Sequence, residues 1–164
     1  MIKLRWILVV ILILIALSII PYSKQEIIYE QSGIEPEIFF CPRDDCAGKL
    51  VKFISESKVS IYCAFFEIKH ADIEKALLDS AQKGVDVKLF VDSDYKENKL
   101  FKKVNTRFDV GDKFSHNKFC VRDKEVVWTG SMNPTINDVS KNNNNVLIYH
   151  SKYLAENYED EFFE

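Results

Sequence analysis

From residue 37 onward, the pattern of hydrophobic and polar positions is typical of strands in some segments and of helices in others. Residues 59–68 and 85–92 are rich in β-branched and aromatic side chains, which predicts strands, and the first run is apolar on both faces, as in a central strand. Between them, the helical period of residues 71–84 predicts a helix that Gly84 terminates. Strands that alternate with helices predict a layered α/β domain.

The remaining segments extend this pattern. It predicts strands at 37–40 and 146–149, helices from Asp44 or Asp45 as N-cap, near 134–139 and from about 151, and helix or loop over the polar stretch 96–107. Two further runs, 116–122 and 125–130, are separated by only two residues. Strands joined by so tight a turn are antiparallel, so we expect a mixed sheet between helices.

Residues 1–22 differ from this domain in character. One Lys and one Arg precede WILVVILILIALSII, fifteen residues with a single polar side chain. The segment predicts a transmembrane helix over residues 4–22, although a cleaved signal peptide has similar features. The flanking cations favour an N-terminus on the cytoplasmic side, so the domain is exported on either interpretation. Residues 23–36 are polar and predict a linker, which leaves 37–164 as the folded domain.

Composition supports a folded domain and limits its partners. The 164 residues are 47% hydrophobic and 13% aromatic, enough to bury a core. A formal net charge of -3 gives no bulk attraction to nucleic acid or anionic lipid, so any such attraction must be local. One local basic stretch can follow a nucleic-acid backbone or serve as an ordinary solvated face: Lys96, Lys99, Lys102, Lys103 and Arg107.

Four cysteines leave the redox state of the domain open. Cys63 and Cys120 fall within apolar runs, where we expect buried free thiols. Cys41 and Cys46 flank a turn and can bond to each other, which an exported domain permits. A zinc site that combines this pair with His70 is a weak alternative, because CxxxxC with one distant His is a poor ligand pattern.

Residues 116–133, HNKFCVRDKEVVWTGSMN, predict a hairpin that carries many polar side chains. A two-residue turn makes Arg122 oppose Glu125, so that His116 faces Ser131. Alternation along the strands then places four polar side chains on one face: His116, Lys118, Ser131 and Asn133. Apolar side chains point the other way into one core layer: Phe119, Val121, Val126 and Trp128. Gly130 is expected to let the backbone closely approach a bound group.

The chemistry of this polar set favours a phosphate. Its Lys, Ser and Asn are hydrogen-bond donors and no carboxylate is among them, so the set suits an anion with several oxygens. The His supplies a nucleophile or proton carrier near neutral pH. No cluster of metal ligands accompanies it, which predicts chemistry without a metal or other cofactor. Each residue alone has an ordinary structural explanation, and Asp123 in particular is typical of a turn.

The spacing H-x-K-x4-D-x6-G-S-x-N resembles the signature of the phospholipase D superfamily. Six residues match it without departure: His116, Lys118, Asp123, Gly130, Ser131 and Asn133. The chain looks most similar to small single-motif members, the bacterial phosphodiesterase-type nucleases and the mitochondrial Zucchini-type enzyme. Weaker similarities extend over most of residues 37–164. The resemblance implies a phospholipase D-like fold, with a mixed sheet sandwiched between helices.

The resemblance also implies a mechanism. His116 of one subunit would form a phosphohistidine and His116 of a second subunit would protonate the leaving group, so a homodimer is expected from a chain with one motif. Lys118, Ser131 and Asn133 would hold the phosphate, and Asp123 would be structural. Related nucleases often carry a Glu that orients the His where this chain has Asn144, which puts its rate or pH optimum in question.

Two substrate classes remain open on this basis. The first is an endonuclease for single-stranded nucleic acid, which the basic stretch supports. The alternative is a phospholipase D or a cardiolipin-type phosphatidyl transferase, which a membrane segment at residues 4–22 supports by holding the site near lipid headgroups. An inactive membrane-tethered interaction module is a minor third alternative that the intact motif disfavours. In each case we expect a single-pass membrane protein with its domain outside the cytoplasm.

Overall fold

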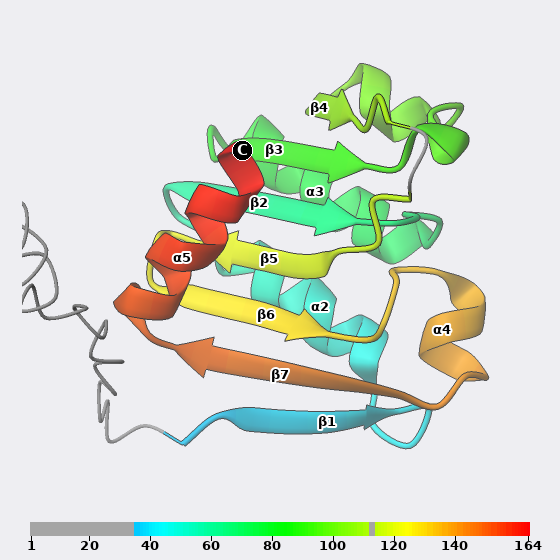
Figure 1. Cartoon of the computed structure of the whole chain (residues 1–164). Helices are drawn as coiled ribbons and strands as arrows, with labels where there is room; N and C mark the ends of the chain where they lie inside the picture. The colour runs from blue at the N-terminus through cyan, green and yellow to red at the C-terminus, as the bar shows by residue number, and fades with distance from the viewer. Residues whose placement is uncertain (1–34, 112–113) are drawn as a thin grey trace, which may run out of the picture. The chain divides into compact units, whose positions relative to one another are not determined.

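A seven-stranded mixed sheet organises residues 35–111 and 114–164, the part of the chain that the computed structural model describes (Figure 1). The strands lie in the order β1-β7-β6-β5-β2-β3-β4. Their bounds are β1 Glu37–Cys41, β2 Ser60–Phe65, β3 Asp86–Val91, β4 Asn105–Phe108, β5 Lys118–Arg122, β6 Val126–Gly130 and β7 Asn144–His150. Strands β2, β3 and β4 pair in parallel and the other neighbours are antiparallel, which confirms the mixed sheet.

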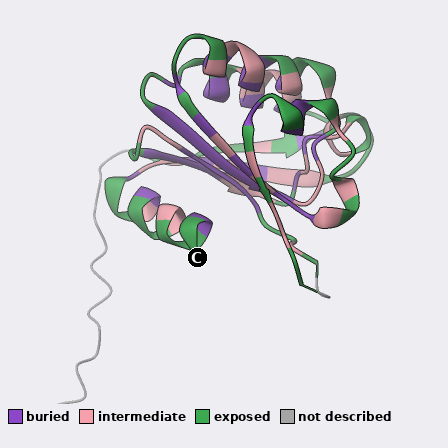
Figure 2. Ribbon diagram, turned by 90° about the horizontal axis from the view of Figure 1, so that it is seen from above, coloured by how far each residue is buried: buried purple, intermediate pink, exposed green. Residues whose placement is uncertain are grey.

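Helices cover both faces of this sheet (Figure 2). Helices α2 (Cys46–Ser55) and α3 (Ala71–Gln82) lie on one face and α5 (Lys152–Phe163) lies on the other. The buried apolar side chains accordingly form two clusters, a larger one under α2 and α3 and a smaller one under α5. The connections carry three short helical segments: α4 (Ile136–Ser140), η1 (Ser93–Tyr95) and η2 (Lys99–Lys102). The sandwiched arrangement is therefore confirmed.

The two longer helices on the first face form where capping and apolar period agree. The carboxylate of Asp45 accepts from the backbone N–H of Gly48 at 2.9 Å and begins α2. Apolar side chains at spacings of three and four then face the sheet: Leu50, Phe53 and Ile54 in α2, and Ile73, Ala76 and Leu77 in α3. Gly84, with φ +88°, follows α3 and lets the chain turn into β3, as the sequence predicted.

Two segments differ from the prediction. Strand β4 lies within the stretch expected to be helix or loop, and β7 begins at Asn144 instead of residue 146. Strand β4 has only four residues at the edge of the sheet, and its sequence NTRF has too few apolar positions to show a period. In β7 the backbone of Asn144 and Asn145 pairs with β1, a contact that the composition of the Asn run does not reveal.

The predicted register of the β5–β6 hairpin is wrong by one residue. Arg122 pairs with Val126 instead of opposing Glu125, and Phe119 pairs with Thr129. Asp123 and Lys124 have φ values of 53° and 58°, and Glu125 stays in the turn, where its N–H donates to the carbonyl of Arg122. The loop therefore holds three residues instead of two.

The one-residue shift also changes which side chains share a face. Phe119, Val121 and Val127 pack under α5, whereas Cys120, Val126 and Trp128 pack under α2 and α3. The prediction of a single core layer for Phe119, Val121, Val126 and Trp128 is therefore wrong, because those four residues divide between the two layers. Both faces of β5 and β6 are covered, so the hairpin is a central element of the sheet.

The four cysteines form two disulfides, and one of these involves the two cysteines that were expected to be free thiols. Cys63 of β2 and Cys120 of β5 are register partners in adjacent antiparallel strands and are bonded to each other, which corrects the prediction of free thiols. Cys41 and Cys46 are also bonded, as the sequence allowed. The zinc site is wrong because both of its thiols are in that bond, and His70 lies at the N-terminus of α3.

The predictions for residues 1–34 lie outside the described part of the chain. They include the membrane segment, the signal-peptide alternative and most of the linker. Between residues 35 and 164, leaving out 112–113, no helix combines the length and the apolar character needed to cross a bilayer.

Candidate active site

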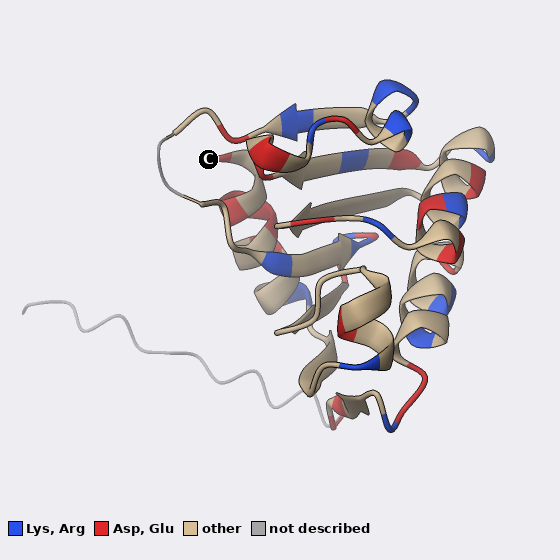
Figure 3. Ribbon diagram, turned by 90° about the vertical axis from the view of Figure 1, so that its right-hand side faces the viewer, with Lys and Arg blue, Asp and Glu red and all other residues tan. Residues whose placement is uncertain are grey.

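The residues of the signature other than Asp123 lie at one end of the sheet, where β2, β3 and β6 end and β5 and β7 begin. This end is on the right of Figure 1 and faces the viewer in Figure 3. His116 and Lys118 stand at the start of β5, and Gly130, Ser131 and Asn133 follow the end of β6. The site thus joins two chain segments that the hairpin brings together.

Lys118 is the buried cation of the site. The residue is only 9% exposed, and its Nζ donates to the backbone carbonyl of His116 at 2.8 Å. Burial lowers the pKa of Lys118, and the negative charge of Asp138 opposes that shift. Among the described residues Lys118 forms no salt bridge, so its charge is available to an anion.

His116 is exposed at the surface of this end. Its imidazole centroid lies 5.2 Å from that of Phe66, in an edge-on contact. The preceding residue is held by Asp92, a buried carboxylate at the end of β3 that accepts from the N–H of Ser115 at 2.9 Å. The imidazole is therefore positioned by backbone anchoring and one aromatic contact, and no described side chain hydrogen-bonds to it.

Gly130 and Ser131 are positioned by β7. Gly130 has φ +154°, and a Cβ atom there would lie 2.1 Å from the carbonyl oxygen of Asn145. The close approach that requires glycine is therefore to the neighbouring strand, which differs from the expected approach to a bound group. The Ser131 N–H donates to that same Asn145 carbonyl at 3.0 Å.

Asn144 organises Ser131 through its side chain. The Ser131 hydroxyl donates to Oδ1 of Asn144 at 2.9 Å and accepts from the N–H of Asn145 at 3.1 Å. The Nδ2 group of Asn144 donates to the carbonyl of Asp138 at 3.1 Å. Asn144 thus touches the site through Ser131, and the hydroxyl must rotate before it can donate to a phosphate.

Asn133 has an unsatisfied side chain. Its Oδ1 atom is buried without a hydrogen-bond partner among the described residues. Its backbone N–H is held by Asp138 Oδ2 at 2.8 Å, and the other oxygen of Asp138 accepts from Asn142 at 2.7 Å. A buried carboxamide without a partner is costly in a finished core and is typical of a site that receives a ligand.

Two residues of this end carry no signal in the motif. Phe66 follows β2 and was expected to continue that strand, but the strand ends at Phe65 and Phe66 turns toward His116. Asp138 lies in α4 and links the charge of Lys118 to the backbone of Asn133. Only the fold shows that these side chains belong with the motif.

Asp123 lies at the opposite end of β5 from Lys118. Its carboxylate accepts from the backbone N–H groups of Lys58, Val59 and Ser60, at 2.7 to 3.1 Å. These bonds fix the hairpin turn against the start of β2. The arrangement agrees with a structural role for Asp123, and it places the residue away from Lys118, Ser131 and Asn133.

The five residues of the basic stretch have two different environments in the structure. Lys96, Lys99, Lys102 and Lys103 are exposed around η1 and η2 at the β4 edge of the sheet, where Figure 3 shows basic residues gathered. Arg107 differs because its guanidinium donates to the carbonyl of Phe162 and lies over the rings of Phe90 and Phe162. Four of the five predicted nucleic-acid contacts thus form no salt bridge with a described residue, and Arg107 anchors α5.

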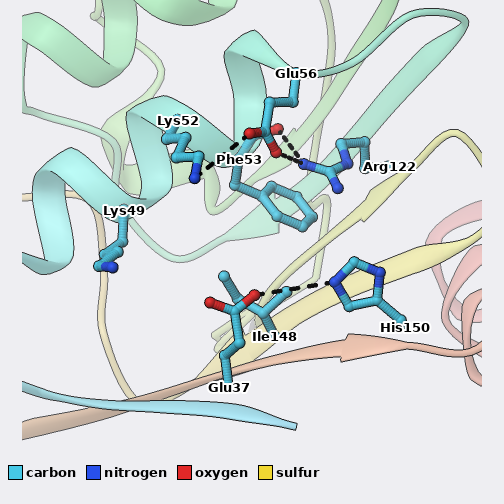
Figure 4. Close-up of a pocket in the computed structure, with 8 residues that line it drawn as sticks. All are labelled: Glu37, Lys49, Lys52, Phe53, Glu56, Arg122, Ile148 and His150. Carbon is cyan, nitrogen blue, oxygen red and sulfur yellow. Dashed lines mark hydrogen bonds and ion pairs between the residues drawn. The ribbon is translucent and has the colours of Figure 1, made fainter. Parts of the chain in front are cut away.

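A cavity of about 140 Å³ lies at the other end of the sheet, between α2 and the ends of β5 and β7 (Figure 4). Charged side chains line it, and most of them are paired with one another. Arg122 contacts Glu56 at 2.7 Å, Lys52 lies 3.7 Å from Glu56, and His150 lies 3.9 Å from Glu37. The cavity contains no residue of the signature, and its paired charges indicate a structural network.

Comparison with known proteins shows similarity to phospholipase D-like proteins. Residues 50–164 match the family described as "Cardiolipin synthase, PLD-like domain". The chain is 31% identical over 131 residues to a phospholipase D of Rickettsia prowazekii, covering 76% of this chain and 64% of the relative. It is 27% identical over 144 residues to a mitochondrial cardiolipin hydrolase of Xenopus tropicalis, covering 79% and 69%. The chain thus spans somewhat less than two thirds of the Rickettsia relative.

A solved structure shows the same architecture. The phospholipase D family member Nuc from Salmonella typhimurium superposes with a TM-score of 0.69 at 26% identity, over 78% of this chain and 92% of Nuc. Nearly all of Nuc therefore aligns with this chain, so the two proteins share the architecture of the domain.

Proposed function

The chain belongs to the phospholipase D superfamily of phosphodiesterases, and from this premise we propose that it cleaves single-stranded nucleic acid through a phosphohistidine, without a metal ion. The single observation that carries the proposal is the exposed imidazole of His116 beside the buried, unpaired ammonium of Lys118. A nucleophile next to a cation that no described carboxylate neutralises suits an anionic phosphoryl group.

The reaction has two steps. In the first, an imidazole nitrogen of His116 bonds to phosphorus while the bond from phosphorus to the leaving oxygen breaks, and that oxygen takes a proton from His116 of the partner subunit. In the second, water attacks phosphorus and gives its proton back to that partner imidazole. The phosphorus–nitrogen bond then breaks, which restores His116.

The other residues of the site stabilise the transferring group. Lys118 offsets the charge that grows on the phosphoryl oxygens, and the Asn133 carboxamide donates to one of them. Ser131 contributes its hydroxyl after rotation away from Asn144. Because Asn144 holds Ser131, and no hydrogen bond joins it to the imidazole in the described part of the chain, its replacement of the usual Glu alters the donor set more than the basicity of His116.

The active unit is a homodimer. The reaction needs two imidazoles and the signature supplies one per chain. His116 stands exposed at an open end of the sheet, so a two-fold axis there brings two such residues together.

The domain acts outside the cytoplasm, tethered through residues 4–22. The apolar segment and its flanking cations support this location. The two disulfides support it as well, because such bonds persist in oxidising compartments. The four lysines of the basic stretch, Lys96, Lys99, Lys102 and Lys103, provide the local attraction for a polyanion that the net charge of -3 lacks.

The test uses the full-length chain in detergent with a labelled single-stranded oligonucleotide and excess EDTA. Wild-type cleavage is expected, and His116→Ala is expected to be inactive while remaining dimeric by light scattering. Equal cleavage by the two proteins would remove His116 from the reaction. A folded wild-type dimer that cuts no nucleic acid would contradict the nuclease assignment.

Phospholipid hydrolysis is the second candidate. The names of two relatives, a phospholipase D and a mitochondrial cardiolipin hydrolase, favour it, as does the predicted membrane segment. The same preparation reconstituted in vesicles that contain cardiolipin distinguishes the candidates. Formation of phosphatidic acid and phosphatidylglycerol from cardiolipin by the wild type, but not by His116→Ala, would identify a lipid substrate for the same site.

A further inference from the structure

An aromatic cluster adjoins His116 on the side of β2 and β3. Phe66 lies at its centre, and its ring centroid is 4.9 Å from Tyr95, 5.7 Å from Phe114 and 5.2 Å from the imidazole of His116. The Nζ atom of Lys118 lies 5.5 Å from the same centroid. The cluster therefore lies directly next to His116 and Lys118.

None of the three rings is fully buried, although Tyr95 packs against the larger core cluster. Phe114 is 70% exposed, and Phe66 and Tyr95 are half-buried. Their mutual contacts are edge-on, which leaves ring faces open to a further planar group. Aromatic side chains held in water beside a nucleophile gain little from folding, so they indicate a binding surface.

The charges near the cluster disfavour a second phosphate there. Burial raises the pKa of Tyr95, and the carboxylates of Glu67, Asp94 and Asp92 raise it further. This negative surrounding repels a phosphate or an anionic lipid headgroup. The same carboxylates do not repel an uncharged ring, and they can accept hydrogen bonds from the amino groups of nucleobases.

We propose that Phe66, Tyr95 and Phe114 form a stacking subsite for one nucleobase, next to the phosphodiester that Lys118 holds. The inference rests on the proposed nuclease function and adds to it a second point of contact with substrate. Every base offers a π face, so the subsite selects unpaired strands without selecting sequence. Bases in a duplex are already stacked and paired, which makes them unavailable to it.

The first experiment measures kcat and KM for oligonucleotide cleavage by the full-length chain in detergent. The variants are Phe114→Ala, Phe114→Leu and Phe114→Tyr, with Phe163→Ala as a matched control because Phe163 is a 47% exposed phenylalanine at the end of α5. Removing the ring is expected to raise KM about tenfold with little change in kcat. Phe114→Tyr and Phe163→Ala are expected to match the wild type.

The second experiment moves an abasic nucleotide along the substrate, on both sides of the cleaved bond. One position is expected to raise the wild-type KM about tenfold and to cause no further rise in Phe114→Ala, since both changes remove the same contact. Thermal melts of each variant check folding, which a mostly exposed side chain is not expected to disturb.

The outcomes separate the two proposals. A wild-type KM in Phe114→Ala, with every abasic position equivalent, would overturn the stacking subsite and leave the nuclease function in place. Failure of Phe114→Tyr to the same extent as Phe114→Leu would overturn stacking as the source of the effect. If the wild type cuts no oligonucleotide, the nuclease function fails and the subsite fails with it.

Discussion

The two ends of the β5–β6 hairpin use similar side chains in opposite ways. At the turn end, Arg122 is paired with Glu56 and lies over Phe53, and Asp123 accepts from three backbone N–H groups. At the open end, Lys118 has no carboxylate partner among the described residues, and Asn133 Oδ1 has no hydrogen bond.

The difference shows how one element can supply both stability and a site. Charges that are paired at the turn fix the position of the strands. At the other end, the strands then hold a cation without a described carboxylate partner and a carboxamide oxygen without a described donor. Unsatisfied groups are tolerated there because the rest of the hairpin is buried on both faces. If this interpretation is right, substitutions at the open end change activity, and substitutions at the turn end change stability.

His116→Ala gives the largest expected effect and tests the open end. Loss of the nucleophile is expected to lower kcat by at least about 10³-fold. The melting temperature is expected to stay within about 1 °C, because the imidazole is exposed and only its contact with Phe66 is lost. A marked fall in melting temperature would mean that the open end also stabilises the fold.

Asp123→Ala tests the turn end. Removing the acceptor of three N–H groups is expected to cost about 2–3 kcal/mol in the free energy of unfolding, measured with urea. Asp123→Asn keeps one oxygen and is expected to lose about half as much. The kcat of the folded protein is expected to stay unchanged, so a catalytic defect at full folding would give Asp123 a role in the reaction.

Arg122→Ala tests the paired network around the cavity at the turn end, with a smaller effect. The Arg122 side chain is 12% exposed, and its loss is expected to cost about 1–2 kcal/mol, through lost packing on Phe53 as well as lost charge. Lys52→Ala is the control, because its contact with Glu56 is longer and exposed and contributes within about 0.5 kcal/mol. Equal losses in both variants would argue against a specific network.

Asp138→Asn gives the smallest effect and refines the electrostatics of the open end. Burial lowers the pKa of Lys118 and the Asp138 carboxylate opposes this, so removing that charge lowers the pKa further. Phosphate binding needs the ammonium, and activity is lost as pH rises through its pKa. The alkaline limb of the pH–kcat/KM profile is therefore expected to move to lower pH, with little change near neutrality. An unmoved limb would show that Lys118 does not set it.

Much of this protein follows from local sequence. The period of residues 71–84, the apolar run before Phe66 and the capping residue Asp45 determine a helix, a central strand and a helix start, because each depends on neighbours a few positions away. The motif spacing likewise predicts the chemistry, since it gives the expected donors and the expected nucleophile in order.

Tertiary structure decided what depends on distant segments. Asp123 bonds to residues 58–60, more than sixty positions away, and the loop that it holds keeps Glu125 and shifts the register by one residue. Cys63 meets Cys120 only because β2 and β5 become neighbours.

The phosphate site and the aromatic cluster show the same division. Lys118 and Asn133 are recognisable from their spacing, but Asp138, Phe66, Tyr95 and Phe114 join them only at the end of the folded sheet. A sequence determines which side chains are present and with what local period the apolar and polar positions recur. Which of them meet is determined by the register and order of the strands, and those follow from contacts between segments that no local pattern contains.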